Sequence, residues 1–311
     1  MDRATDSLIP LLDFRDWTEG SPARQATFVA QVGAALETYG FVSIEGHGVP
    51  DALVAEAYGA AHEVFALPDE ALRVYERPEV ARQRGYTPLF LEKAKDRSAA
   101  DLKAFWHVGR DLPADHPLAD LMPANAFPDP LVPEFGRSTR ALFAALEGFA
   151  LQMLDVIARH LGVPPDGFRD LVRDGNSVLR VIHYPDLDGP APVGAVRAAA
   201  HEDINLLTVL PAATRPGLEL LTRDGTWMPV TAPPGVLVCD TGDMMQLLTG
   251  GRLPATTHRV VNPSAQDGGR LSMPFFLHPR PDALLTPLWG DAPSKRAHDF
   301  LLERLVANNV A

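Results

Sequence analysis

Residues 178–184, with the sequence VLRVIHY, begin a series of short apolar and β-branched segments that fills the C-terminal half of the chain. Glycine, proline, aspartate and asparagine separate these segments, a pattern typical of strands joined by tight turns. The connections are too short for the crossover helices of a parallel sheet. We therefore predict a double-stranded β-helix, or jelly roll. Its expected strands lie in segments 178–184, 206–210, 218–222, 227–230, 236–239, 256–261 and 271–278.

Helical periodicity dominates the sequence before residue 175. Apolar side chains recur every three or four residues over 28–39, which places them on one helix face. Similar patterns predict helices over 51–65, with Asp51 as the N-cap, and over 138–161. A last amphipathic helix is expected over 295–305. The predicted fold is mixed α and β, with a jelly-roll core, a helical N-terminal lobe and a C-terminal helix.

The change in pattern along the chain predicts four regions. We expect an N-terminal region over 1–125 and a connecting helix region over 126–174. The jelly roll is expected over 175–285 and the C-terminal helix over 286–311.

Composition limits the possible partners. The 311 residues include 28 Lys and Arg against 40 Asp and Glu, a formal net charge of −12. A field of that sign repels phosphate backbones and anionic lipid, so we expect neither nucleic acid nor a membrane as partner. The N-terminal sequence lacks an apolar signal segment, and the lone cysteine, Cys239, excludes an intramolecular disulfide. We expect a cytoplasmic protein, either a monomer or a weak homo-oligomer.

The sequence HEDIN, residues 201–205, contains the first candidate site residues. On extended backbone, His201 and Asp203 point to the same face, because side chains alternate along a strand. An imidazole and a carboxylate side by side form two-thirds of the facial triad that binds non-haem Fe(II). The pair by itself is equally typical of a helix cap or a surface ion pair.

A third candidate ligand is His258, in the strand-like segment 254–262. A jelly roll brings distant strands together, so the gap in sequence is no obstacle. Two histidines and one carboxylate leave three octahedral positions of iron open, for a bidentate ligand and O2. A zinc hydrolase site shares these ligand types, but an open face suits Fe(II) better. Between the ligands, Gly242-Asp243 is interpreted as a structural turn.

Two further candidates, Arg270 and Ser272, lie twelve and fourteen residues after His258, at the start of the predicted strand 271–278. Because they are two residues apart on extended backbone, their side chains point to the same face. A guanidinium and a hydroxyl that point together into a barrel can bind one carboxylate by charge-assisted hydrogen bonds. Tyr184, on the predicted strand 178–184, is placed to reach the same small acid. Each of these residues by itself is also compatible with an ordinary structural role.

Taken together, these motifs resemble the isopenicillin N synthase-like branch of the Fe(II)/2-oxoglutarate-dependent dioxygenases. The resemblance covers nearly the whole chain. Its motifs, in order, are IPLLDF at 9–14, GFVSIEGHGVP at 40–50, FALP at 65–68, RGYTP at 84–88, HED at 201–203, THRVVN at 257–262 and RLSMPFF at 270–276.

The resemblance implies cofactors and residue roles. Fe(2+) would be bound by His201, Asp203 and His258. 2-Oxoglutarate would be bound by Arg270 and Ser272, with Tyr184 nearby. The co-substrate and O2 would be converted to succinate and CO2 while a small molecule is oxidised, commonly by hydroxylation. Residues that would approach this prime substrate are Arg84, Tyr86, Trp106 and Phe276, and those that would line a lid are Phe90, Leu91, Lys93, Lys95 and Lys103.

Two alternatives remain open at this point. Isopenicillin N synthase and aminocyclopropane-carboxylate oxidase share the Arg-x-Ser pair without consuming 2-oxoglutarate, and the stretch Tyr184–Asp188 resembles the synthase. The position two residues before Tyr184, often asparagine in plant members, is Ile182 here. An Fe(II) oxidase of the synthase type is therefore one alternative. The other is a non-catalytic jelly-roll binding protein.

Overall fold

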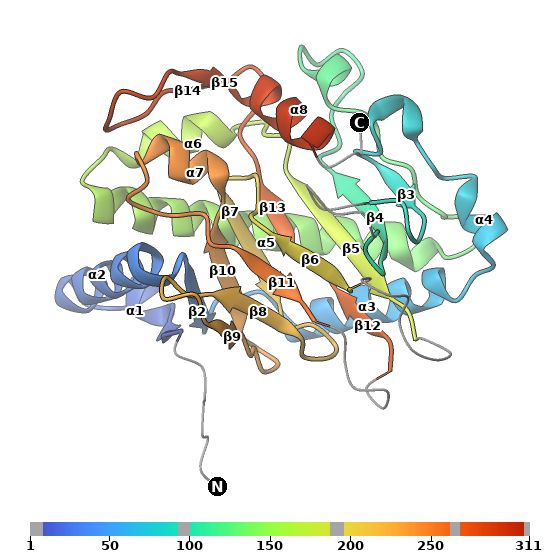
Figure 1. The fold of residues 1–311 in the computed structure, drawn as a ribbon, viewed down its shortest axis with the longest axis horizontal. Helices are drawn as coiled ribbons and strands as arrows, with labels where there is room; N and C mark the ends of the chain where they lie inside the picture. Colours follow the sequence, from blue (N-terminus) through green and yellow to red (C-terminus); the bar gives the residue numbers. More distant parts are fainter. Residues whose placement is uncertain (1–8, 93–99, 187–195, 262–267, 308–311) are drawn as a thin grey trace, which may run out of the picture.

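The computed structural model describes residues 9–92, 100–186, 196–261 and 268–307 (Figure 1). In these residues the strands form a nine-stranded sheet, a four-stranded sheet and a two-stranded ribbon. The large sheet has the order β1 (Leu11–Asp13), β2 (Phe41–Glu45), β10 (Leu237–Thr241), β7 (Leu207–Pro211), β13 (Phe275–Leu277), β5 (Val178–Tyr184), β4 (Ala104–Gly109) and β3 (Gly85–Thr87), with β12 (Arg270–Ser272) also paired to β5.

The small sheet faces the large one and completes the jelly roll. Its strand order is β6 (Ala198–His201), β11 (His258–Val260), β8 (Leu218–Leu221) and β9 (Trp227–Pro229). All of its pairings are antiparallel, as in the large sheet except between β1 and β2. The ribbon is formed by β14 (Leu284–Leu285) and β15 (Lys295–Arg296).

Helices cover the outer face of the large sheet. The described helices are α1 (Arg15–Thr18), α2 (Pro22–Tyr39), α3 (Asp51–Phe65), α4 (Asp69–Arg73), α5 (Pro133–Leu161), α6 (Pro165–Val172), α7 (Asp243–Leu248) and α8 (Ala297–Ala307), with 3-10 turns at Pro78–Val80 and Ala119–Leu121. Of these, α2, α3 and α5 pack together with the large sheet around the main hydrophobic core.

The long helix α5 runs across the outer face of the large sheet (Figure 1). Phe143 on this helix packs edge-to-face on Phe275 of β13, with ring centroids 5.0 Å apart. By length and composition α5 is apolar enough to cross a bilayer, but 56% of its most apolar window is buried inside the molecule. Such burial is expected of a core helix, whose apolar face packs on a sheet.

Two small apolar clusters lie between the sheets. One joins Phe41 and Val238 of the large sheet to Leu220 of the small sheet. The other joins Ile182 to Val260. Residues of both clusters, Phe41 on one side and Ile182 with Val260 on the other, line the same cavity. Both clusters therefore border the cavity between the sheets.

The structure confirms the predicted fold class and adjusts its details. The N-terminal lobe supplies strands as well as helices, since β1 and β2 extend one end of the large sheet and β3 and β4 the other. The expected strand 271–278 is two strands, β12 and β13, which are interrupted at Met273 and Pro274. Proline has no N–H for the ladder, so a strand ends readily at that position.

Several helix boundaries also differ from the predicted ones. Asp51 is the first helical residue of α3, and Pro50 is its N-cap without a side-chain hydrogen bond. Helix α5 begins at Pro133, five residues before the expected start, because proline fits the first helical turn. Residues Lys295 and Arg296 form β15 rather than the start of the last helix.

Candidate metal and co-substrate site

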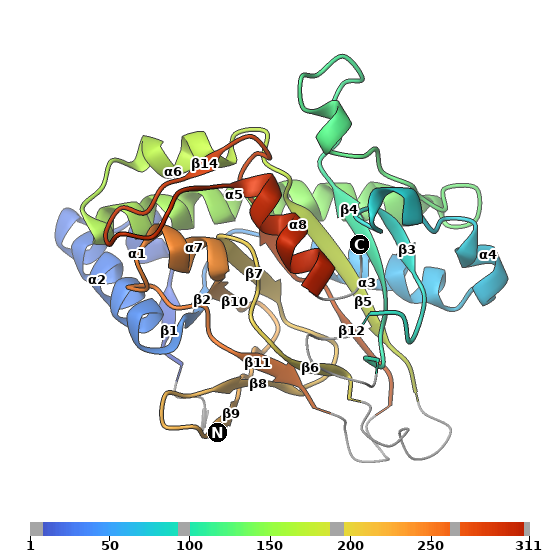
Figure 2. The same ribbon diagram turned by 45° about the horizontal axis from the view of Figure 1, so that its top comes forward.

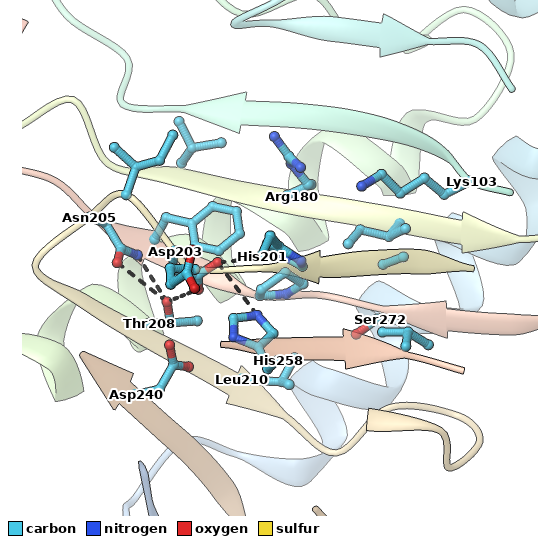
Figure 3. A pocket seen from close by; sticks show the side chains of 18 of the residues that line it. Lys103, Arg180, His201, Asp203, Asn205, Thr208, Leu210, Asp240, His258 and Ser272 are labelled. Carbon is cyan, nitrogen blue, oxygen red and sulfur yellow. Dashed lines mark hydrogen bonds and ion pairs between the residues drawn. The ribbon is translucent and has the colours of Figure 1, made fainter. Parts of the chain in front are cut away.

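The two candidate histidine ligands lie directly opposite each other in the small sheet. His201, the last residue of β6, pairs in register with His258, the first residue of β11. Directly opposed side chains in an antiparallel pair are close neighbours, and the two imidazole centroids are 4.4 Å apart. Asp203 follows β6 by two residues and turns its carboxylate to the same side (Figure 3).

The three side chains converge on one point. Asp203 Oδ1 lies 3.9 Å from His201 Nε2 and 3.7 Å from His258 Nε2. One ligand atom from each of the three residues lies within 4.8 Å of the others. Each Nδ1 contacts a backbone carbonyl two residues earlier, at 2.7 Å in His201 and 3.1 Å in His258. These carbonyls place the proton on Nδ1 and leave both Nε2 lone pairs free for a metal.

The surroundings of His201 and Asp203 favour the protonation states that a metal needs from these two residues. Burial lowers the pKa of His201 to about 4, and the neighbouring imidazole of His258 adds to this effect. Burial alone would raise the pKa of Asp203, but His258 and His201 outweigh it and keep that pKa below its usual value. Neutral imidazoles and an ionised carboxylate are the forms that bind a divalent ion.

Polar residues behind Asp203 fix its second oxygen. The Thr208 hydroxyl donates to Asp203 Oδ2, and Asn205 donates to Thr208 Oγ1 at 3.0 Å (Figure 3). Burial, together with the nearby charge of Asp203, raises the pKa of Asp240 well above its ordinary value. Both effects favour the protonated form of Asp240 next to the Asp203 carboxylate.

The start of α7 holds the loop that carries Asp203. The N–H of Asp243 donates to the carbonyl of Asp203 at 2.8 Å, and the N–H of Met244 donates to those of Ile204 and Asn205. A Cβ on Gly242 would lie 2.4 Å from the Asn205 carbonyl oxygen and 2.8 Å from that of Asp203. The sequence predicts a turn at Gly242-Asp243, whereas in the structure the pair begins a helix that positions Asp203.

Substituting Gly242 by alanine is therefore expected to displace the Asp203 loop. We expect a loss of about 1–3 kcal/mol in the free energy of unfolding, typical of overpacking, and about a tenfold loss in Fe(II) affinity. Gly148→Ala is the matched control, because a Cβ at this position in α5 meets nothing within 4 Å. Calorimetric Fe(II) titration and chemical denaturation measure both effects. Unchanged Fe(II) affinity in Gly242→Ala would show that the close approach does not position Asp203.

The predicted co-substrate residues lie side by side on the large sheet. Arg270 and Ser272 of β12 pair in register with Tyr184 and Ile182 of β5, and all four line the cavity. The Arg270 guanidinium lies 5.1 Å from the centroid of the Tyr184 ring, and its Nε donates to the Arg215 carbonyl at 2.9 Å. Its Nη1 is buried without a hydrogen-bond partner among the described residues.

Burying a guanidinium N–H without an acceptor costs free energy. The unpartnered Nη1 of Arg270 therefore indicates that a bound group supplies a hydrogen-bond acceptor at this position. The cavity that connects Arg270 to the triad has a volume of about 150 Å³. Leu301 and Leu305 of α8, which lies beside β5 in Figure 2, line the same cavity. The residues present therefore fit a ferrous ion next to a small dicarboxylic acid.

Comparisons with known proteins give the family. Residues 175–279 match the 2OG-Fe(II) oxygenase superfamily, and residues 9–130 match the family described as non-haem dioxygenase in morphine synthesis N-terminal. A 2-oxoglutarate-dependent dioxygenase from Monascus ruber is 30% identical over 95% of this chain and 94% of its own length. The chain belongs to the 2-oxoglutarate-Fe(II) oxygenases. A 2-oxoglutarate-Fe(II) type oxidoreductase from Emericella nidulans is likewise 30% identical, over 88% of this chain and 80% of its own.

Solved structures show the same fold. A 2OG-Fe(II) oxygenase family protein from Caulobacter crescentus superimposes with a TM-score of 0.86 at 38% identity, covering 96% of this chain and 99% of that one. A full-length protein of Neurospora crassa, solved in complex with α-ketoglutarate, gives a TM-score of 0.82 at 23% identity, with 96% of each chain covered. The enzymes of this family use Fe(2+), 2-oxoglutarate and O2.

Three of the four residues expected to approach the prime substrate of this oxygenase do not line the cavity. Tyr86 and Trp106 are paired in register on the opposite face of β3 and β4, where Trp106 packs on Phe135 of α5. Arg84 is fully buried and donates to Asn176. The prediction for these three residues is wrong in position, because alternation along β4 turns Trp106 to the helices. Phe276 does line the cavity.

The expected lid is only partly described. Lys93 and Lys95 lie outside the described residues. Phe90 is 49% exposed and borders an outer groove rather than the cavity of the oxygenase. Lys103 is buried in the cavity wall between two carboxylates. Its neighbours Glu92 and Asp101, and also Arg180, are cavity residues that the sequence analysis missed.

Proposed function

We propose that His201, Asp203 and His258 hold the ferrous ion of this oxygenase and that the enzyme hydroxylates a small molecule. The observation that carries the proposal is the convergence of two Nε2 atoms and one carboxylate oxygen, with both Nδ1 atoms turned to backbone carbonyls. Two histidines and one carboxylate are the ligand set of non-haem Fe(II) oxygenases. The three remaining octahedral positions suit a bidentate co-substrate and O2.

We further propose that Arg270 and Ser272 bind the distal carboxylate of 2-oxoglutarate. The unpartnered Nη1 of Arg270 supports this role, and so does its register opposite Tyr184. Tyr184 is 2% exposed, and its ring contributes an apolar wall beneath the guanidinium. Since no described hydrogen bond involves its hydroxyl, the predicted contact of Tyr184 with the co-substrate remains part of the proposal.

Iron and 2-oxoglutarate, when bound, supply the oxidation of the substrate and leave succinate and CO2 as co-products. The protein's own residues position and enclose the reactants. Thr208 and the start of α7 orient Asp203, and Arg270 neutralises a carboxylate inside the fold. Leu301 and Leu305 of α8 exclude water from one side of the cavity.

Succinate formation separates this proposal from an Fe(II) oxidase that uses no 2-oxoglutarate. In air, with Fe(II) and 2-oxoglutarate, we expect slow succinate formation even before the prime substrate is known, measured by mass spectrometry. The reaction should stop when a chelator is added or O2 is excluded. A rate equal to that of Fe(II) and 2-oxoglutarate without protein would favour the oxidase or the non-catalytic binding protein.

The remaining expectations are part of the same proposal. We propose a cytoplasmic enzyme, since its single cysteine, Cys239, is buried and free. The net charge of −12 supports a small-molecule substrate rather than nucleic acid or a membrane surface. We also propose a monomer or a weak homo-oligomer.

A further inference from the structure

Four buried side chains and the half-buried Arg180 form a polar wall on the cavity, next to the triad. We use the name polar wall for Glu92, Asp101, Lys103, His107 and Arg180, all of which line the cavity. In Figure 3, Arg180 and Lys103 lie on one side of the triad and Asp240 lies on the other. None of these five residues has a role in the proposed binding of iron or 2-oxoglutarate, so the polar wall is free to contact the prime substrate.

The charge of Lys103 is fully matched inside the wall. Its Nζ lies 2.9 Å from Glu92 Oε2 and 2.9 Å from Asp101 Oδ2. Asp101 also accepts a hydrogen bond from the backbone N–H of Ala199, at 3.1 Å. Burial alone would lower the pKa of Lys103, but the two carboxylates raise it above its ordinary value. Lys103 is therefore charged, but its charge is neutralised by Glu92 and Asp101 and is not available to a ligand.

Arg180 is the member of the wall with free donor capacity. Its Nε donates to His107 Nε2 at 2.7 Å, and His107 Nδ1 lies 2.8 Å from the Arg82 carbonyl, so His107 is neutral with its proton on Nδ1. Arg180 Nη1 makes only long contacts of 3.4 Å to Glu92. Among the described residues Nη2 has no hydrogen-bond partner, and the side chain remains 19% exposed.

The position of Arg180 separates it from the co-substrate residues. Arg180 and Tyr184 are four residues apart on β5, which is about 13 Å of strand, and Tyr184 is the register partner of Arg270. The two arginines therefore lie at different ends of one cavity. The Arg180 guanidinium lies 5.5 Å from the centroid of Phe276, the one predicted substrate residue that lines the cavity. A substrate that contacts the Phe276 ring from inside the cavity therefore lies next to Arg180.

The wall contains two cations, Lys103 and Arg180, and two anions, Glu92 and Asp101, so its formal charge is zero. A carboxylate bound at Arg180 would compete with Glu92 for the guanidinium and leave one buried anion in excess, which is unfavourable. A neutral carbonyl oxygen accepts from Arg180 without displacing Glu92. We infer that the prime substrate is uncharged where it meets the polar wall and that one of its carbonyl oxygens is bound by Arg180. This inference rests on the proposed function.

The matched pair benzamide and benzoate tests the inference, because the two probes share a planar shape and differ in charge. Isothermal titration is done anaerobically on the full chain with Fe(II) and saturating 2-oxoglutarate, which blocks the Arg270 end. We expect wild-type protein to bind benzamide at least about tenfold more tightly than benzoate. The inference is overturned if the two probes bind equally or if benzoate binds more tightly. It is also overturned if neither probe binds at about 10 mM, a concentration above the Kd expected even of weak specific binding.

Removing one negative charge from the wall should abolish the preference for benzamide. In Glu92→Gln the wall gains a net positive charge, so we expect benzoate to bind at least about tenfold more tightly than it binds wild type, with benzamide little changed. Glu147→Gln is the matched control, since Glu147 is a half-buried glutamate paired with Arg110 and lies outside the cavity lining. An unchanged benzoate affinity in Glu92→Gln contradicts the charge argument.

Substitution of the arginine tests the contact itself. Arg180→Leu should lose benzamide binding, whereas Arg140→Leu should keep it, because Arg140 pairs with Asp111 and packs on Phe127 outside the cavity lining. Retained benzamide binding in a folded Arg180→Leu variant overturns the inference. If that variant does not fold, Glu92→Gln decides. Formation of the Fe(II)–2-oxoglutarate complex is measured separately by absorption, so failure of the inference is distinguishable from failure of the proposed function.

Discussion

Asp203→Ala is expected to lower Fe(II) affinity and turnover by more than about 100-fold, because even the loss of an outer-shell partner costs about 10–100-fold. The two imidazoles that remain offer no charge to the metal. The fold should survive, since Thr208 keeps a partner in Asn205 and the substitution removes a buried charge next to Asp240. Circular dichroism and calorimetric Fe(II) titration measure the fold and the metal separately.

Glu202→Ala is the matched control for Asp203→Ala. Glu202 is the intervening residue, and its carboxylate accepts from Thr257 rather than facing the imidazoles. This variant should retain Fe(II) affinity within about threefold, as expected for an exposed surface position. Comparable Fe(II) binding by Asp203→Ala and wild type would remove Asp203 from the site, whereas equal losses in both variants would point to a general disturbance of the loop.

Arg270→Leu is expected to raise the KM for 2-oxoglutarate by about 100-fold or more. The variant loses both a charge-assisted hydrogen bond and the counter-charge of a buried carboxylate, which together cost about 2–5 kcal/mol of binding free energy. Fe(II) affinity in the absence of 2-oxoglutarate should remain that of wild type, because Arg270 is not one of the three clustered ligand candidates. Succinate formation as a function of 2-oxoglutarate concentration measures the effect.

Arg259→Leu controls for the loss of an arginine near the site. Arg259 follows His258 but pairs with Glu219 and lies over the Trp227 ring, away from the cavity lining. Its KM for 2-oxoglutarate should be unchanged. If Arg270→Leu also kept the wild-type KM, another group would have to bind the co-acid.

The clustering of the three candidate ligands was predictable from the sequence because its signals are local. His201 and Asp203 are two residues apart, and strand alternation alone places them on one face. His258 is more than fifty residues further along the chain, in a β-branched segment that was predicted to be a strand. The jelly roll brings it next to His201 by pairing β11 with β6. Arg270 and Ser272 follow the same alternation. The family resemblance added the order of the motifs along the chain.

The substrate side was not predictable in the same way. Glu92 and Arg180 are 88 residues apart, and Glu92 lies between β3 and β4 rather than on a strand, so no local pattern links the two residues. Tyr86 and Trp106 were misplaced because β3 and β4 were not recognised as strands within a region dominated by helical patterns. With β4 identified, Lys103, Phe105 and His107 alternate with Trp106, and the period-two pattern separates the cavity face from the helix face.

The central claim is that one ferrous ion binds to His201, Asp203 and His258 and chelates 2-oxoglutarate. Anaerobic titration of the protein with Fe(II) and then 2-oxoglutarate tests it most directly, by visible absorption. We expect a metal-to-ligand charge-transfer band that saturates at one equivalent of Fe(II), that requires 2-oxoglutarate, and that is absent in Asp203→Ala. A wild-type spectrum without this band at saturating Fe(II) and 2-oxoglutarate would contradict the claim.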